Sequence, residues 1–473
     1  MTKARIRRKL GSIESLKAHI ESGQENPEDA SEAPYPRWVR INTLKTTLED
    51  QLETTFAECG RSTSVDGVRQ RDSKQVHIDA HIPNLVAVSP LVDLLNSEAY
   101  KSGAIIFQDK ASCFPAYLLD PLVEDGDVVD TCSAPGNKTT HIAAILLSHS
   151  SEPDDCKQKI HAFEKNKARA KTLEKMVSIA GSNVWTTLHP GQDFLKTSPG
   201  SPMFKDVGAL LLDPSCSGSG IVGRDDMPPL HLPVLEQSGA AASKAPKKGA
   251  KRPDKSKETR KRKREEDEDL IMVDDDGVVT SVDTGDELKT RLAALSAFQL
   301  DLLLHAFKFP AARKITYSTC SVHAEENESV VQRALASDVA KQHGWRILKR
   351  DDQVRGMREW PVRGSAEACG EEDPELAEAC IQANKGDEHG TMGFFLAGFV
   401  RDPPAAGDAD ADAQFLRDER GHMVRDLLGF PVRVDPGANA NQPASQEGVE
   451  DEQGAGEEGE EEWNGFSDDE DLV

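Results

Sequence analysis

Short apolar runs alternate regularly with amphipathic segments between residues 127 and 400, and this pattern restricts the fold more than any other feature of the chain. Residues 140–147 and 168–181 show helical spacing, the second segment closing on a glycine, and each lies between two apolar runs. Strands that alternate with helices favour an α/β fold with a doubly wound, mostly parallel sheet. The final runs, 345–350 and 393–400, have no helix between them and are expected to add an antiparallel edge.

Two cysteines lie just beyond the ends of two of these runs. Cys216 follows LLLDPS, and Cys320 ends ITYSTC. Strands of an open α/β sheet deliver their carboxyl ends into the crevice that binds ligands, so two thiols placed there indicate chemistry rather than packing. The eight cysteines show neither a disulfide framework nor a CxxC or Cys/His spacing, which predicts reduced thiols and no structural metal.

A small-residue turn, DTCSAPGNKTTH, follows the first apolar run at residues 130–141. The exposed N–H groups of the helix that it opens would face a nucleotide-like ligand. The alternative is the phosphate-binding loop of a nucleotide hydrolase, because Gly136-Asn-Lys138-Thr resembles GK[ST] and Leu-Leu-Leu-Asp213 resembles its partner strand. Asn137 separates the glycine from the lysine, and Thr131 stands where the first glycine of that loop belongs. The phosphate cradle is therefore not predicted.

Two acidic residues follow the next two apolar runs. Glu164 is placed to accept hydrogen bonds from ribose hydroxyls, and Asp193 to receive an amine or amide donor from a base edge. Either could instead cap a helix. Together with the Gly136 turn, they predict a site for an adenosine-containing cofactor.

The net charge of −25 is concentrated outside the alternating region. Residues 404–473 carry 20 acidic side chains against four arginines and are expected to form a disordered acidic tail, which either solubilises the protein or binds a protein partner around Trp463 and Phe466. Residues 225–286 are expected to be a disordered charged insertion. Its basic run, 247–264, has eleven Lys/Arg against two acidic residues and indicates a nuclear import address or an RNA contact.

The chain shows neither an 18-residue apolar run nor an apolar segment behind its basic N-terminus, so we expect a soluble intracellular protein with no membrane contact. Residues 116–403 are the predicted catalytic domain, and residues 35–115 a smaller α+β domain that binds RNA through its basic side chains. Trp38 in that domain could stack on a base or be buried in the core. Residues 1–34 are predicted to be helical or flexible.

Several of these motifs together resemble the Sun-type RNA cytosine-5 methyltransferases, which use S-adenosylmethionine. The resemblance rests on DTCSAPGNKTTH, on the turn from Asp213 to Cys216, on YSTCS around Cys320 and on GFF at Gly393. PRWVRINTLK (36–45) and IIFQDKASC (105–113) also resemble segments that precede the catalytic domain in that family, and the similarity covers about 37–400 apart from the insertion. DPSCSGSG is similar to the eukaryotic branch that modifies large-subunit ribosomal RNA.

The resemblance implies a Rossmann-like methyltransferase sheet and a role for each thiol. Addition of a thiolate to C6 of cytosine activates C5 toward a methylsulfonium, and a second thiol assists release. The family pattern makes Cys320 the nucleophile and Cys216 the releasing residue, whereas the residues alone leave their order open. Asp213 would hold the base, and Lys138 would stabilise that carboxylate, lower the thiolate pKa, or form only a structural salt bridge. The implied cofactor contacts are Cys132, Ser133, Ala134, Pro135, Gly136, Asn137, Lys138, Glu164, Asp193 and Asp213.

The implied function is methylation of C5 of a cytosine in RNA, with large-subunit (25S/28S) ribosomal RNA as the expected substrate. A thiol reaches C6 only when the base is outside its stack, so the target should be flipped or single-stranded. We expect a monomer that acts on rRNA or pre-ribosomal particles in the nucleus, in the nucleolus, during ribosome biogenesis. The alternative is a catalytically inactive RNA-binding ribosome-assembly scaffold of the same fold.

Overall fold

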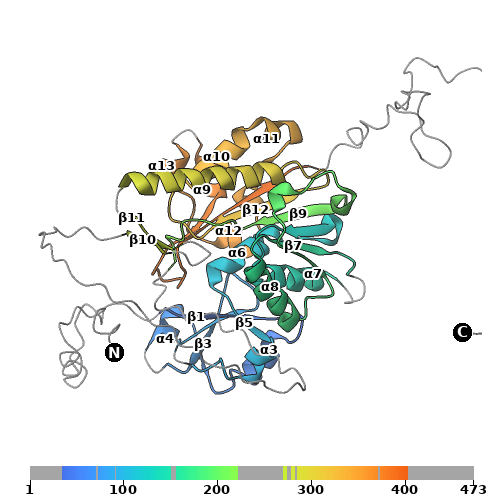
Figure 1. Cartoon of the computed structure of the whole chain (residues 1–473). Helices are drawn as coiled ribbons and strands as arrows, with labels where there is room; N and C mark the ends of the chain where they lie inside the picture. The colour runs from blue at the N-terminus through green and yellow to red at the C-terminus, as the bar shows by residue number, and fades with distance from the viewer. Residues whose placement is uncertain are drawn as a thin grey trace, which may run out of the picture. The chain divides into compact units, whose positions relative to one another are not determined.

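The computed structural model describes residues 35–70, 73–90, 92–150, 156–221, 270–273, 279–282, 285–370 and 373–402 (Figure 1). The predicted N-terminal segment, the basic run at 247–264 and the acidic tail lie outside the described residues. Among the described helices, none has both the length and the apolar character needed to cross a membrane.

The first domain is built on a five-stranded sheet of order β2-β3-β4-β1-β5. Its β4 is buried at all four positions and pairs antiparallel with β1 and β3, which confirms the α+β arrangement predicted for this part of the chain. Its elements are β1 (Arg37–Ile41), α3 (Leu48–Glu53), β2 (Gly60–Ser62), α4 (Val65–Arg69), β3 (Gln75–Ile78), β4 (Leu85–Val88), α5 (Glu98–Lys101) and β5 (Ile105–Phe107).

The second domain contains an eight-stranded sheet of order β13-β15-β12-β9-β6-β7-β8, with β14 also paired to β15. Its strands are β6 (Asp127–Asp130), β7 (Ile160–Glu164), β8 (Thr186–Pro190), β9 (Val207–Leu212), β12 (Lys314–Thr319), β13 (Arg346–Ile347), β14 (Ile381–Ala383) and β15 (Phe394–Val400). Its helices are α6 (Lys110–Leu119), α7 (Asn137–Ser148), α8 (Lys167–Ala180), α9 (Gly285–Ala306), α10 (Glu328–Ala336), α11 (Asp338–His343), α12 (Arg355–Glu359), α13 (Ala366–Cys369) and α14 (Pro374–Ala379). Four 3-10 turns connect them at Val123–Asp125, Phe194–Lys196, Pro202–Phe204 and Arg350–Asp352.

The strand order creates a switch point between β6 and β9. From β6 the chain continues to β7 and β8 on one side, then returns to place β9 and β12 on the other, and these five strands are parallel. Every residue of β7 and β9 is buried, as expected for strands covered on both faces. Loops that leave β6 and β9 therefore start side by side, in the position where such sheets bind ligands.

The far edge of this sheet is antiparallel, as predicted, although three short helices, α12, α13 and α14, lie between β13 and β15 where no helix was expected. β15 pairs with β12 from Lys314↔Val400 to Thr319↔Phe395, and β13 pairs with β15. Each of the first six residues of β15 is buried. This strand therefore lies inside the sheet, and its first residues come close to the end of β12.

The structure differs from the sequence prediction within residues 225–286. β10 (Leu270–Val273) and β11 (Val279–Val282) form an antiparallel pair there, and α9 already begins at Gly285. Both strands consist largely of apolar and β-branched residues, which favour a hairpin over the disorder expected from the neighbouring charged run.

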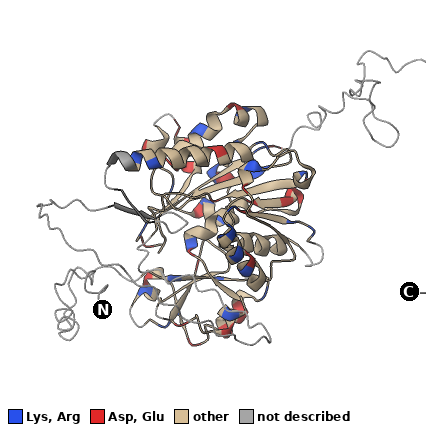
Figure 2. Cartoon of the chain, viewed as in Figure 1, with Lys and Arg blue, Asp and Glu red and all other residues tan. Residues whose placement is uncertain are grey.

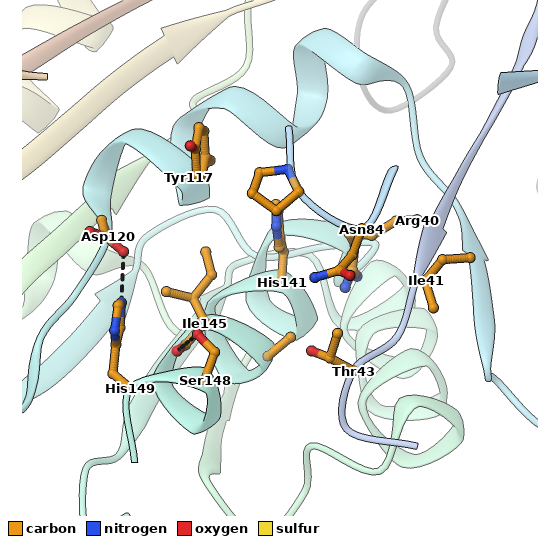
Figure 3. Close-up of a pocket in the computed structure, with 12 residues that line it drawn as sticks. Arg40, Ile41, Thr43, Asn84, Tyr117, Asp120, His141, Ile145, Ser148 and His149 are labelled. Atoms are coloured by element: carbon orange, nitrogen blue, oxygen red, sulfur yellow. Dashed lines mark hydrogen bonds and ion pairs between the residues drawn. The ribbon is translucent and has the colours of Figure 1, made fainter. Parts of the chain in front are cut away.

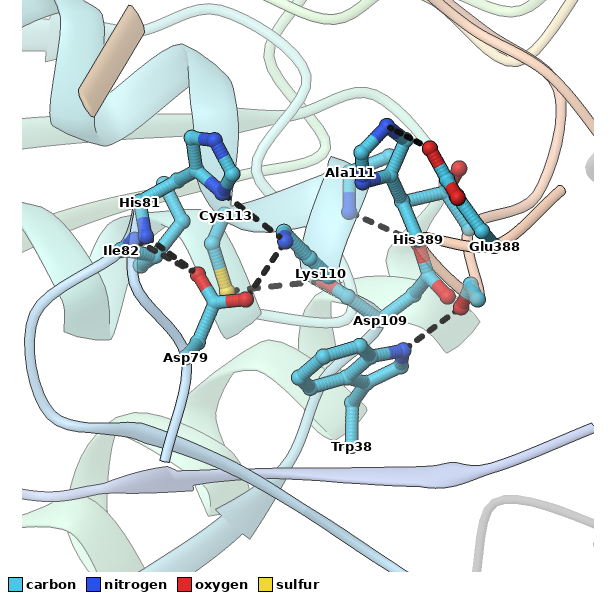
Figure 4. A network of polar contacts seen from close by, with 12 residues as sticks. Trp38, Asp79, His81, Ile82, Asp109, Lys110, Ala111, Cys113, Glu388 and His389 are labelled. Atoms are coloured by element: carbon cyan, nitrogen blue, oxygen red, sulfur yellow. Dashed lines mark hydrogen bonds and ion pairs between the residues drawn. The ribbon is translucent and has the colours of Figure 1, made fainter. Parts of the chain in front are cut away.

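A buried polar network joins the first domain to α6 (Figure 4). Lys110 lies 2.5 Å from Asp79 and 3.3 Å from Nδ1 of His81, and its ammonium is 4.9 Å from the centre of the Trp360 ring. Trp38 is 3% exposed and donates to the carbonyl of Gly390, so this indole is a core residue rather than a surface for base stacking. Elsewhere, basic and acidic residues are interspersed over both domains in the view of Figure 2.

We predict that Lys110→Met lowers the free energy of unfolding by about 3 kcal/mol, because removing one member of a buried ion pair leaves its partner charged and uncompensated. Lys101→Met is the matched control, since Lys101 pairs with Glu98 on the surface, where such pairs contribute under about 1 kcal/mol. Urea unfolding followed by circular dichroism measures both. Equal effects of the two substitutions would contradict the prediction.

Candidate active site

Two adjacent parallel strands bring the cysteines together. β9 and β12 run in register from Lys314↔Ala209 to Tyr317↔Leu212, so the loops that follow them begin next to each other. The sulfur atoms of Cys216 and Cys320 lie 3.0 Å apart. Cys216 is buried at 2% exposure, whereas Cys320 is partly exposed. The pairing expected from the two strand ends is therefore present, and one thiol is more accessible than the other.

Close backbone contacts hold the Cys216 loop against its neighbours. The N–H of Gly220 donates to the carbonyl of Cys320 at 2.9 Å, and the N–H of Gly393 donates to the carbonyl of Gly220 at 2.8 Å. A Cβ on Gly220 would lie 2.2 Å from the carbonyl oxygen of Gly393, and this distance is too short for any side chain at position 220. The close approach of these two backbone segments explains why the Cys216 turn and the GFF segment both contain glycine.

A buried carboxylate, Glu326, orders the same loop. Its Oε1 accepts from the N–H of Ser217 and from Nε2 of Gln299, both at 3.0 Å, and Gln299 also donates to the carbonyl of Ser215. Glu326 is fully buried. The sequence analysis did not identify this residue, because a glutamate before a helical segment is ordinarily a solvated first-turn residue. Its contacts make it a positioning residue for Cys216.

Asp213 and Lys138 form an ion pair beside the thiols. Nζ of Lys138 lies 2.7 Å from Oδ2 of Asp213 and donates to Oγ of Ser112, while Ser318 donates to Oδ1 of Asp213 at 2.6 Å. Burial acts to lower the pKa of Lys138, but the Asp213 carboxylate, together with Asp130 and Cys320, raises it overall. Lys138 therefore stays charged and faces Asp213, which is not the arrangement of a phosphate-binding lysine.

The turn after β6 is compact and anchored on both sides. Gly136 caps α7 with φ of 112°, and a Cβ there would lie 3.0 Å from Cγ of Met176 on α8. The N–H of Ser133 donates to the carbonyl of Phe163, and Thr139 donates to the buried Asp130 at 2.7 Å. Burial raises the pKa of Asp130 to about 6. The residues Cys132, Ser133, Ala134, Pro135 and Asn137 complete this turn.

Glu164 and Asp193 lie at the neighbouring strand ends, as expected. Glu164 is the last residue of β7 and accepts from the N–H of Asn166 at 2.7 Å. Asp193 follows β8, caps the next turn by accepting from the N–H of Leu195, and lies 3.0 Å from Nζ of Lys165. Asp193 thus caps a helical turn, which is the alternative that the sequence left open. Both carboxylates remain candidates for cofactor contacts.

Arg169 is a further residue that the sequence analysis missed. It extends from α8, donates to the carbonyl of Ala134 at 2.9 Å and lies 3.9 Å from Glu164. A basic residue on a helix gives no signal of such a contact until the helix is packed. Asn137 Oδ1 and Thr131 Oγ1 in the same turn are buried without a hydrogen-bond partner among the described residues. Unpaired acceptors beside a small-residue turn fit an adenosine-containing cofactor.

Family models match both domains. The model described as "NOL1/NOP2/Sun domain family member 5, ferredoxin-like domain" matches residues 35–108, and "16S rRNA methyltransferase RsmB/F" matches residues 116–229.

Curated relatives match most of this chain. A 25S rRNA (cytosine-C(5))-methyltransferase of Schizosaccharomyces pombe is 35% identical over 82% of this chain and 67% of its own length. A 28S rRNA (cytosine-C(5))-methyltransferase of Mus musculus is 32% identical over 80% of this chain and 65% of its own. The chain thus spans about two thirds of the length of these relatives. A solved methyltransferase homologue from Pyrococcus horikoshii is 19% identical, with a TM-score of 0.49 over 82% of this chain and 99% of that chain.

We predict that iodoacetamide modifies Cys320 roughly tenfold faster than Cys113, Cys369 or Cys380 in the native protein near neutral pH. Burial raises the pKa of Cys113 to about 12 and that of Cys369 to about 11, so neither forms the reactive thiolate readily. Mass spectrometry of the labelled peptides over time measures the rates, with the denatured chain as control. Equal native rates for Cys320 and Cys113 would contradict the prediction.

Proposed function

The chain belongs to the NOL1/NOP2/Sun domain family of rRNA (cytosine-C5)-methyltransferases, and on this premise we propose that it methylates C5 of a cytosine in large-subunit ribosomal RNA through a covalent adduct with Cys320. The observation that carries the proposal is the 3.0 Å separation of the two thiols beside the Asp213–Lys138 pair. S-adenosylmethionine, when bound, supplies an electrophilic methyl group at the turn after β6.

The proposed reaction begins at the accessible thiol. The Cys320 thiolate adds to C6 of the cytosine, which makes C5 nucleophilic enough to take the methyl group. A base then takes the C5 proton, the electron pair of that C–H bond re-forms the C5–C6 double bond, and the bond between sulfur and C6 breaks to release the Cys320 thiolate. Cys216 assists this elimination from 3.0 Å away. The partial exposure of Cys320 and the burial of Cys216 support this order, because the attacking sulfur must reach the incoming base.

Asp213 and Lys138 bind the base and stabilise the charge that develops on it during the reaction. Asp213 is placed to accept from the exocyclic amine or to share a proton at the ring nitrogen while negative charge develops there. Lys138 pairs with that carboxylate, and Ser318 orients it through the hydrogen bond to Oδ1. Glu326 positions Cys216 without touching the substrate.

The cofactor is proposed to lie along the carboxyl ends of β6, β7 and β8. The contacts come from the turn at Cys132–Asn137, with Glu164 for the ribose hydroxyls and Asp193 for the base edge. The buried, unpartnered Oδ1 of Asn137 supports a ligand at this turn. Lys138 and Asp213 complete the wall between cofactor and base.

The proposed setting is a pre-ribosomal particle in the nucleolus, where large-subunit RNA is exposed before it folds. This placement rests on the rRNA substrates named for the relatives. Bisulfite mapping of large-subunit rRNA from cells that lack the protein identifies the modified cytosine. An unchanged methylation map would overturn the substrate proposal.

We predict that Cys216→Ala accumulates a denaturant-resistant protein–RNA adduct, because its first step is intact and its release is slow. Cys320→Ala should form no adduct and no product. Denaturing gel electrophoresis with transcribed large-subunit RNA and S-adenosylmethionine measures both, and the double variant serves as control. A Cys216→Ala protein that never cross-links would overturn the assigned roles, and methylation by Cys320→Ala would favour a different nucleophile.

We predict that Lys138→Met lowers the single-turnover methylation rate roughly a hundredfold, since Asp213 loses the charge that orients it. Lys171→Met, at an exposed position on α8, is the matched control and should leave the rate unchanged. Transfer of a radiolabelled methyl group to RNA measures the rate. A Lys138→Met protein with the parent rate would limit the pair to a structural salt bridge.

A further inference from the structure

A cavity of about 210 Å³ lies outside the candidate active site, between the first domain and helices α6 and α7 (Figure 3). Its apolar walls include Ile41 and Pro83 from the first domain and Ala144 and Ile145 from α7. Arg40 and His141 also line it. No step of the proposed methyl transfer uses this space.

One face of α7 runs from Lys138 to the cavity. Lys138, His141, Ile145 and Ser148 recur on α7 at spacings of three and four residues, which places them along one face of the helix. Lys138 begins this row at the reaction centre, and the other three line the cavity. His141, the first cavity residue in this row, lies about one helical turn along α7 from Lys138, and Ser148 at the rim lies about 15 Å along the helix from it.

Two buried polar groups in the cavity wall lack partners in the described part of the chain. Arg40 is 1% exposed, and its Nε and Nη2 donate to Gln108 and Thr140, but Nη1 has no acceptor. His141 is 6% exposed, and its Nδ1 has no partner. The great majority of buried polar groups in proteins have a hydrogen-bond partner. Two unpaired groups in the wall of one cavity therefore point to a ligand that supplies the missing hydrogen bonds.

The charge state of these groups limits the ligand. Burial lowers the pKa of Arg40 to about 10, which still leaves it cationic at neutral pH, and no described carboxylate pairs with it. Burial and the Arg40 charge lower the pKa of His141 well below its ordinary value, so this imidazole is neutral. The wall thus offers one charged donor and one neutral imidazole nitrogen between apolar side chains, and its lining also includes the partly exposed Asp120–His149 pair, 2.8 Å apart.

We propose that this cavity binds an unpaired base of the RNA substrate other than the target cytosine. The two apolar faces of a base would pack against the walls at Pro83 and Ile145. A carbonyl oxygen or ring nitrogen on its edge would accept a hydrogen bond from the Arg40 guanidinium. RNA-binding proteins commonly read splayed bases in this way. A phosphate would lose its hydration against the same apolar walls, so it fits less well. The inference rests on the proposed function, because it assigns a second subsite for the same RNA.

The test measures equilibrium binding of the full-length Cys320→Ala protein to a single-stranded RNA of about twelve nucleotides around the mapped cytosine. Neighbouring nucleotides are made abasic one at a time, or their phosphates are replaced by methylphosphonates. We expect one abasic position to weaken binding roughly tenfold. Ser148→Phe, which narrows the exposed rim of the cavity, should bind intact RNA roughly tenfold more weakly and should no longer respond to that abasic position.

Ser178→Phe is the matched control, because Ser178 is exposed on α8 and does not line the cavity. It should behave as the parent. Thr43→Phe narrows the rim from the first domain and repeats the test if Ser148→Phe is unstable.

Three results would overturn the inference. An abasic effect of equal size in Ser148→Phe and Ser178→Phe would locate the base elsewhere, and a loss seen only with a methylphosphonate would identify a phosphate. A parent protein that binds S-adenosylmethionine by calorimetry but binds no RNA would refute the proposed function together with the subsite. The first two outcomes would leave the proposed function intact.

Discussion

The parallel pairing of β9 with β12 is the constraint on which the site depends. Tyr317 lies opposite Leu212, so the thiol that directly follows β12 and the thiol in the loop after β9 start from neighbouring positions. All six residues of β9 are buried, so this pair of strands lies in the interior of the sheet. The packing of Gly220 on Gly393 then closes the distance between the sulfurs. The chemistry is thus set by buried apolar strands rather than by the reactive residues themselves.

The positive charge of Lys138 and the negative charge of Asp213 offset each other in the absence of substrate. Asp130 ends β6 and Asp213 follows β9, and Lys138 in the first turn of α7 pairs with Asp213 at 2.7 Å. Burial raises the pKa of Asp130 to about 6, whereas Asp213 is paired with Lys138. The two carboxylates therefore differ in their partners, because Asp130 accepts from Thr139, whereas Asp213 accepts from Ser318 and pairs with Lys138.

Sequence periodicity predicted the parallel sheet, its antiparallel edge and the strand ends that carry Cys216, Cys320, Glu164 and Asp193, because burial and strand direction are local properties. Glu326 and Arg169 were not predicted, since each acts through a backbone group that only tertiary packing brings near. The hairpin of β10 and β11 was missed because the charged composition around it outweighed two short apolar stretches.

The first domain contributes directly to the architecture of the reaction centre. Arg40 donates to the carbonyl of Asn137 and to Thr140, so a buried cation lies against the first turn of α7. The amino end of a helix already carries partial positive charge, and a guanidinium there is electrostatically unfavourable. A fold selected for stability alone would place an acidic or neutral side chain at this point. The arrangement favours instead an electron-rich group of a ligand at the junction, where it would relieve the guanidinium and link RNA capture to the helix that carries Lys138.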